Sequence, residues 1–251
     1  MNFLGLTLWL LIAYALLFFL RFSLAGQFVG LSLLLTRHAQ PGRILFNLLL
    51  FPGVLVHELS HFFMAATLGV PTGEITIFPH QDQGEKHLGS VKIAHTDPLR
   101  ESLIGAAPLL VSSLLLVALS RWQFPTLFAS NLSLISPLNL LTNLYAKLQS
   151  PLTWLWFYLT FTIANTMFTS QSDRRAWPFI VGLVLMLIVF FSALNLVQSL
   201  GAIILEASTQ VISELNIAFT LTIAVDLFLL SFLTLLSRVV SWITGRKLAS
   251  W

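Results

Sequence analysis

The chain contains no cysteine and few charged residues. Without cysteine there can be no disulfide bond, no thiolate ligand for zinc and no cysteine nucleophile. Only 9% of the 251 residues are charged, whereas soluble proteins have about 25%. The net charge of +3 is modest and no run of Lys or Arg occurs, so the sequence gives no sign of a nucleic-acid partner.

Hydrophobic residues take the place of the missing charges. They make up 57% of the chain, and the mean hydropathy is +0.87. This apolar character is spread along the whole chain, which is too uniform for a soluble core with one membrane anchor. The composition therefore predicts an integral membrane protein that crosses the lipid bilayer several times.

Apolar stretches of about 20 residues, enough to cross the hydrocarbon core, recur along the chain. We expect an all-α polytopic fold with about six transmembrane helices, forming a single membrane domain over residues 1–251. The core would occupy residues 44–175, followed by C-terminal helices in 176–251. The expected spans are Phe3–Leu20, Ile44–Leu68, Leu99–Ser120, Pro151–Ser170, Pro178–Leu200 and Ile217–Ser237. Re-entrant, looped or interfacial structure is expected for Phe22–Leu35, Thr126–Gln149 and Gly201–Asn216.

One polar segment, between Gly69 and Pro98, differs from the apolar helices around it. It contains two short runs, Glu74–Phe78 and Ser90–His95, whose alternating and β-branched residues are typical of strands. Glycine and proline separate the runs, as in a hairpin. Because an open sheet edge cannot face lipid, the hairpin should lie at the membrane interface or against the helices.

The second span contains the sequence His57-Glu58-Leu59-Ser60-His61, a His-Glu-x-x-His motif. Residues four apart share a helix face, so both histidines can direct a ring nitrogen at one metal ion. Glu58 could accept a proton from a metal-activated water. Pro52 and Gly53, just before the motif, predict a kink in this helix. Ionisable groups at membrane depth are costly, which favours a functional site over histidines that serve only packing.

A catalytic zinc ion commonly has three protein ligands, so the two histidines leave one position to fill. Only ten residues are Asp or Glu, and several of them belong to the polar hairpin. Asp173, at the end of the fourth span, and Asp226, inside the last span, are the main candidates. Glu206 is a further possibility, because other classes of zinc peptidase use a glutamate ligand.

Three features of the sequence, taken together, resemble the site-2 protease family of intramembrane zinc metallopeptidases. The first is the His-Glu-x-x-His helix followed by Leu68-Gly69-Val70, and the second is the small-residue stretch Gly105-Ala-Ala-Pro108. The third is the separation of eight residues from Asn165 to Asp173, which matches the family's Asn-x-x-Pro and Asp-Gly signature. The resemblance implies that His57, His61 and Asp173 bind Zn²⁺. It also implies that Glu58 is the catalytic base and that Asn165 binds substrate.

The chain departs from this family pattern at two places. Phe168 stands where the family has proline, and Arg174 and Arg175 stand where it has glycines. Two cations beside the expected ligand Asp173 can keep its carboxylate ionised, but a salt bridge with them would compete with zinc.

The expected function is that of a zinc-dependent endopeptidase that hydrolyses peptide bonds of transmembrane or membrane-associated protein substrates. The alternatives are a catalytically impaired membrane protein that retains the metal for a binding or regulatory role and, less favoured, an ion-coupled transporter. With the hairpin in the cytosol, eight of the 13 Lys and Arg residues fall on the cytosolic side. This arrangement predicts an active site toward the cytosol and, for an even number of spans, both chain ends there.

Overall fold

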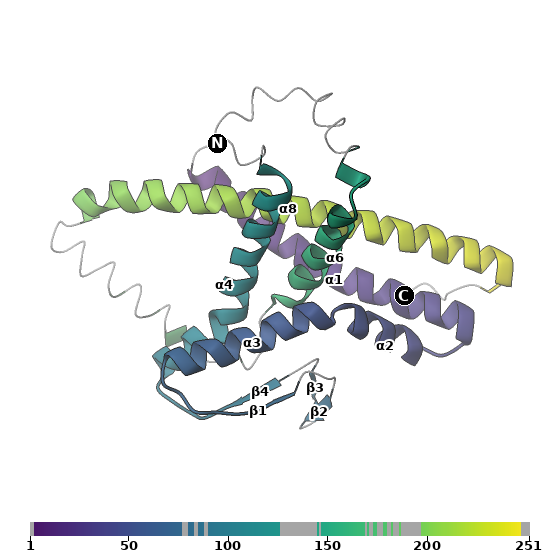
Figure 1. Ribbon diagram of the computed structural model, residues 1–251, viewed down its shortest axis with the longest axis horizontal. Helices are drawn as coiled ribbons and strands as arrows, with labels where there is room; N and C mark the ends of the chain where they lie inside the picture. Colours follow the sequence, from purple (N-terminus) through teal and green to yellow (C-terminus); the bar gives the residue numbers. More distant parts are fainter. Residues whose placement is uncertain are drawn as a thin grey trace.

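The computed structural model describes residues 3–76, 80–82, 85–87, 90–125, 145, 147–168, 170, 173–174, 178–179, 182, 186 and 197–246. Most of the expected span Pro178–Leu200 and of the expected loop Thr126–Gln149 lies outside these residues. The described part confirms the fold class, with long apolar helices and a small antiparallel β-hairpin region after the helix that carries the His-Glu-x-x-His motif (Figure 1).

The first helix is longer than the sequence predicted. α1 runs without interruption from Phe3 to Thr36, over 34 residues. The prediction of a separate re-entrant or interfacial segment at Phe22–Leu35 is therefore wrong. Each glycine inside a helix costs about 1 kcal/mol relative to alanine, and this stretch has two. The same stretch packs closely on neighbouring helices, and this packing outweighs the low helix propensity of its glycines.

The last helix also corrects a prediction. α8 (Val197–Thr244) is one continuous helix of 48 residues, so the expected interfacial segment Gly201–Asn216 is its first part. Polar residues of this part bond to neighbouring helices instead of ending the helix. Glu214 Oε1 accepts a hydrogen bond from Arg121 at 2.5 Å, and Asn216 Nδ2 donates to the carbonyl oxygen of Leu6 at 2.9 Å.

α1 and α8 lie side by side and run in the same direction (Figure 1). Near their starts, Trp9 Nε1 donates to Thr220 Oγ1 at 3.1 Å. Near their ends, Arg246 Nη1 donates to the carbonyl oxygen of Leu34 at 2.5 Å. The sequence separation of the bonded partners stays between 210 and 212 along the whole contact. A constant separation of this kind is the mark of a parallel pair.

The helix that carries the motif begins at a sharp bend. α2 (Gln40–Leu49) and α3 (Phe51–Thr67) are separated by one residue, Leu50, and are bent by 61° relative to each other. Pro52 lies in the first turn of α3, where its missing N–H leaves no hydrogen bond unmade. The expected kink is thus confirmed.

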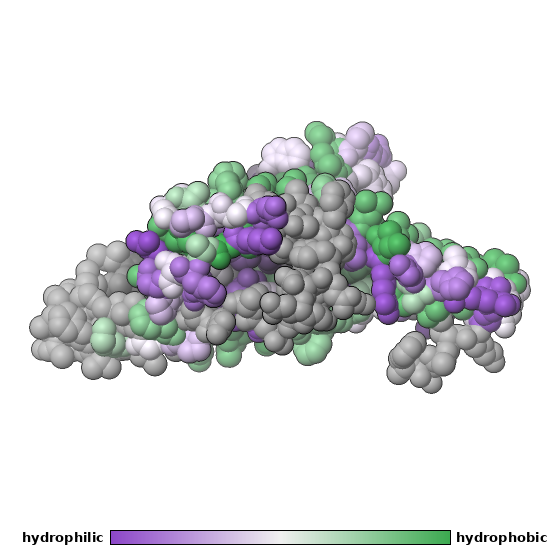
Figure 2. Space-filling model, turned by 90° about the horizontal axis from the view of Figure 1, so that it is seen from below, coloured by the Kyte–Doolittle hydropathy of each residue, from purple (hydrophilic) through white to green (hydrophobic). Residues whose placement is uncertain are grey.

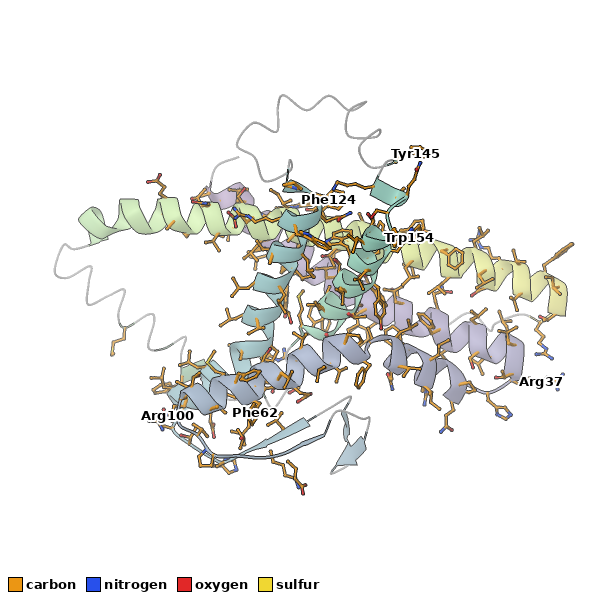
Figure 3. The ribbon with its side chains drawn as sticks, viewed as in Figure 1. Arg37, Phe62, Arg100, Phe124, Tyr145 and Trp154 are labelled. Carbon is orange, nitrogen blue, oxygen red and sulfur yellow. The ribbon has the colours of Figure 1, made fainter. Side chains whose placement is uncertain are left out.

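Two further helices lie between α3 and the α1–α8 pair (Figure 1). They are α4 (Pro98–Gln123) and α6 (Pro151–Thr166). Figure 3 labels Arg100 and Phe124 at the two ends of α4, so that this helix leads from the neighbourhood of α3 to the opposite side of the molecule. Asp97 caps the N-terminus of α4, and its Oδ1 accepts a hydrogen bond from the backbone N–H of Arg100 at 3.1 Å. This bond lowers the pKa of the Asp97 carboxyl.

The β-structure follows α3, where the sequence placed it. β1 (Thr72–Thr76) pairs antiparallel with β4 (Ser90–Ile93), with an irregularity between Thr72 and Ile75. β2 (His80–Asp82) pairs antiparallel with β3 (Glu85–His87). Both outer strands contact α3, and Ile93 packs on a small core of Ala65, Val70 and Ile104. The hairpin thus lies against the motif helix, as expected for strands that must avoid lipid.

In the described part of the chain, three helices are long and apolar enough to cross a membrane, and the bent pair α2–α3 would make a fourth. Large hydrophobic side chains are exposed on their outer faces, among them Leu114 at 68% and Phe19 at 66%. Figure 2 shows hydrophobic patches on the described part of one face, with hydrophilic groups at the end where α1 passes into α2 and also on the opposite half of that face. Such a surface suits contact with lipid, and the number of spans stays a prediction.

Candidate metal centre

The candidate metal centre is built on α3, α4 and the segment after α6. His57 and His61 lie one turn apart on α3, with ring centroids 5.0 Å apart and planes at 79°. α3 packs closely on α6 because Gly53 has no side chain. A Cβ at this position would overlap the carbonyl oxygen of Thr162 on α6. This glycine lets the motif helix approach the end of α6.

A backbone carbonyl fixes the orientation of His57. Its Nδ1 lies 2.7 Å from the carbonyl oxygen of Thr166, the last residue of α6. Because a carbonyl oxygen can only accept, Nδ1 must carry the proton, and Nε2 is left with a free lone pair. The Thr166 carbonyl is available because the last carbonyls of a helix have no partner within that helix.

His61 is held in the same way, but its acceptor lies inside a helix. Its Nδ1 is 2.9 Å from the carbonyl oxygen of Ile104 on α4. In a regular helix this carbonyl would accept from the N–H of residue 108, but residue 108 is proline. Pro108 thus leaves a free acceptor within the helix, and His61 uses it. Nε2 of His61 is again the nitrogen that remains for a ligand bond.

The third member of the group is Asp173. Its Oδ1 is 3.5 Å from Nε2 of His61, and its Oδ2 is 3.9 Å from Nε2 of His57. The ligand atoms of all three residues lie within 4.8 Å of one another, and the group could hold a metal ion. Oδ2 also accepts from the backbone N–H of Ser170 at 2.6 Å, which fixes the carboxylate. Gly105 makes room for this segment, because a Cβ there would overlap the carbonyl oxygen of Asp173.

These distances suit a single small cation. Zinc bonds of about 2.0–2.1 Å in tetrahedral geometry place ligand atoms roughly 3.3 Å apart. The distances from the two oxygens of Asp173 to the histidines, 3.5 Å and 3.9 Å, are about 0.2–0.6 Å longer than this value, so a bound ion would draw the three side chains slightly closer. Two imidazole nitrogens that are free of protons and one carboxylate are also ligands that zinc commonly takes. By geometry and donor type, the group therefore fits the metal that the resemblance implies.

Glu58 is buried beside this group and is 5% exposed. It lies close enough to Asp173 for the two carboxylates to interact electrostatically. Two carboxyl groups near each other in an apolar setting repel unless a cation or a proton lies between them. The neighbourhood of Glu58 is thus one that a divalent metal would stabilise.

The other acidic candidates lie elsewhere. Asp226 is 1% exposed and accepts hydrogen bonds from Asn165 Nδ2, at 3.1 Å to Oδ1 and 3.2 Å to Oδ2. Glu206 is exposed on α8. Neither belongs to the metal-binding group found among the described residues. Asn165, which the resemblance assigns to substrate, is itself 1% exposed and bonded to Asp226, and its substrate role stays a prediction.

Phe168 and Arg174, two of the residues that depart from the family pattern, have defined contacts in the fold. The Phe168 ring is buried against α1, 5.2 Å from the ring of Tyr14 and 5.4 Å from that of Phe18. The guanidinium of Arg21, on the same face of α1, lies 5.9 Å from the Phe168 ring centroid. These three residues anchor the segment between Thr166 and Asp173, where the family has a proline.

Arg174 is exposed, and its Nε donates to the carbonyl oxygen of Ser170 at 3.2 Å. Arg175, the next residue along the chain, lies outside the described residues. Arg174 thus contacts the backbone of the residue that also holds Asp173.

Searches among protein-family models, curated proteins and solved structures found no match to this chain. The function must therefore be inferred from the site itself. The sequence singled out the three residues of the metal group, but it did not identify the Thr166 and Ile104 carbonyls. For Ile104 a signal existed, since a proline inside a helix always frees the carbonyl four residues earlier.

Proposed function

We propose that this protein is an intramembrane zinc metalloprotease, similar to the site-2 protease family, that hydrolyses peptide bonds of membrane protein substrates. One observation carries the proposal. His57, His61 and Asp173 direct ligand atoms at one point among apolar helices, with the buried carboxyl of Glu58 beside them. Soluble zinc peptidases use the same motif on a helix to activate water.

Zinc, when bound, would act as a Lewis acid toward water and toward the scissile carbonyl group. His57 and His61 would hold it through Nε2, since both Nδ1 atoms already donate to backbone carbonyls. Asp173 would supply an oxygen and remove most of the positive charge that must otherwise be buried.

In the proposed reaction Glu58 accepts the proton of the attacking water and then delivers it to the leaving amine. Its apolar surroundings exclude bulk water, which strengthens electrostatic interactions within the site. Asn165 would contact the substrate, as the resemblance implies. The outer strands β1 and β4, which lie against α3, offer an edge on which an unwound substrate segment could add a strand. We place this site toward the cytosolic side of a multi-pass protein.

The test replaces Glu58 with Gln, which keeps the size and hydrogen-bonding capacity of the side chain but removes the base. The Glu58→Gln protein should retain zinc, measured by metal analysis after purification in detergent. It should lose at least about 100-fold in cleavage of a single-span membrane substrate, because general bases contribute roughly 10²–10⁴-fold. Glu206→Gln, the same change at an exposed position of α8, is the matched control and should cleave at the wild-type rate.

Cleavage by Glu58→Gln at the wild-type rate would overturn the proposal. One observation favours a second candidate, a metal-retaining protein with a binding or regulatory role. Arg174 contacts the residue that positions Asp173, at a place where the family has glycine. A wild-type protein that holds zinc but cleaves none of a panel of membrane substrates would support this second candidate.

A further inference from the structure

Asp226 is a carboxyl group buried in the middle of the last apolar helix, with 1% of its surface exposed. A carboxyl group at this depth is costly, and such residues are usually functional. The partner that the structure gives it is the amide of Asn165, whose Nδ2 donates to both carboxyl oxygens. The pair joins α8 to the last turn of α6.

Asn165 is held firmly at this place. Its Nδ2 donates also to the carbonyl oxygen of Phe161, one turn earlier, at 2.9 Å. Its Oδ1 is buried and accepts no hydrogen bond from the described residues. The contacts of Nδ2 with Phe161 and Asp226 fix which end of the amide faces Asp226. The next residue, Thr166, offers the carbonyl oxygen that accepts from His57.

We propose that Asp226 is a positioning residue for the metal centre. Its bond to Asn165 fixes the end of α6, and the end of α6 presents the Thr166 carbonyl that holds the proton on Nδ1 of His57. Without this bond the last turn of α6, whose final carbonyls have no helical partners, would move more freely. Nε2 of His57 would then be less well oriented for a ligand bond. The inference depends on the proposed metal centre but not on proteolysis.

The proposal attributes the effect to a hydrogen bond and not to the negative charge. Asp226→Asn keeps an oxygen that can accept from Asn165, and its new N–H group can donate to the unpaired Oδ1 of Asn165. This variant should bind zinc within about threefold of the wild type. Asp226→Leu removes every polar atom at a similar volume. Loss of outer-shell support typically weakens metal binding by about 10–100-fold, and we expect a loss in this range.

The zinc affinity of each variant would be measured in detergent by competition with a chromophoric chelator. Thr222→Val is the matched control, because Thr222 is also fully buried on α8, one turn before Asp226, but among the described residues its hydroxyl bonds only to Ala218 of its own helix. It should leave the affinity unchanged. The proposal is overturned if Asp226→Leu binds zinc like the wild type, if Asp226→Asn loses as much as Asp226→Leu, or if Thr222→Val loses as much.

A reciprocal exchange keeps the proposal testable if the leucine variant does not fold. Asn165→Asp places two carboxyl groups face to face and should weaken zinc binding. Adding Asp226→Asn restores an amide–carboxyl pair with its members exchanged, and most of the loss should be recovered. Absence of any recovery in the double variant would contradict the proposal.

A measurement on metal-free protein separates this proposal from the proposed function. Nitrogen-15 NMR of histidine-labelled protein reports which ring nitrogen carries the proton, and His57→Gln identifies the His57 signal. The wild type and Asp226→Asn should show His57 protonated on Nδ1, whereas Asp226→Leu should show a mixture of tautomers. An unchanged tautomer in Asp226→Leu overturns the positioning role, even if the protein is a protease. A changed tautomer supports it, even if no substrate is ever cleaved.

Discussion

Replacing Pro108 with alanine should move the stability of the fold and the strength of the metal site in opposite directions. Pro108 lies inside α4 and frees the Ile104 carbonyl oxygen for Nδ1 of His61. An alanine at this position brings back an N–H group that points at the same carbonyl. Ile104 is 3% exposed and His61 6%, so water cannot easily replace the lost partner of the imidazole.

The two effects can be estimated separately. A proline inside a helix costs about 3 kcal/mol relative to alanine, so the metal-free variant should be more stable by up to roughly this amount. Loss of an outer-shell hydrogen bond to a ligating histidine weakens metal binding by about 10–100-fold. This range corresponds to about 1.4–2.8 kcal/mol of binding free energy. Because a carbonyl oxygen has two lone pairs and could serve both donors, the lower end of the range is expected.

Two measurements on detergent-solubilised protein would check this. Thermal unfolding in the presence of a chelator should show a higher midpoint for Pro108→Ala, and chelator competition should show weaker zinc binding. Pro98→Ala is the matched control, because Pro98 begins the same helix, where a missing N–H breaks no bond. A Pro108→Ala protein that binds zinc as tightly as the wild type would refute the role assigned to the Ile104 carbonyl.

Three further predictions concern the same region. Replacing both His57 and His61 with alanine should abolish zinc binding, because a single carboxylate cannot hold the ion. Metal analysis would measure this, and full zinc occupancy of the double variant would contradict the assignment of these ligands. Gly105→Ala should displace the backbone of Asp173, because the new Cβ would overlap its carbonyl oxygen. Zinc affinity, measured by chelator competition, should then fall at least about tenfold. Unchanged affinity would show that the segment around Asp173 can shift without loss of the site. Because the pKa of Asp97 is lowered in the folded state, its hydrogen bond to the start of α4 stabilises the fold at pH values above the ordinary carboxyl pKa of 3.8. This stabilisation is lost as the pH falls through the pKa of the folded state. The difference in unfolding midpoint between wild type and Asp97→Ala should therefore be present at pH 6 and shrink below about pH 4, and a pH-independent difference would contradict this.

Much of the candidate site follows from local sequence rules. A spacing of four residues places His57 and His61 on one helix face in any α-helix, and the structure needed only to keep α3 helical. The sequence also located the bend before α3 and the hairpin after it, because proline, glycine and β-branched residues act locally. Elimination among the acidic residues left Asp173 and Asp226 as the main candidates, and only the family resemblance favoured Asp173, since nothing local joins it to residues more than 100 positions earlier.

The errors at Phe22–Leu35 and Gly201–Asn216 have a common physical cause. Both segments contain glycines or polar residues that weaken an isolated helix, and a local pattern of this kind predicts a break. In the fold Phe22–Leu35 packs on neighbouring helices, and tertiary packing outweighs propensity there. Gly201–Asn216 is mostly exposed from Leu205 to Val211 and bonds to neighbouring helices at Glu214 and Asn216. The partners of Asn216 and Glu214 come from helices distant in sequence, so no local pattern could have revealed them.

The shared direction of α1 and α8 has a consequence for how the chain passes through a bilayer. Two parallel helices that each cross once leave the membrane by the same face. The chain from Thr36 to Val197 must then return to the first face, which takes an odd number of crossings. If both helices do cross once, the total from Phe3 to Thr244 is odd as well, which differs from the six spans predicted from the sequence. On that condition the parallel pair predicts that Phe3 and Thr244 lie in opposite compartments, whereas an even number of spans would place both chain ends in the cytosol.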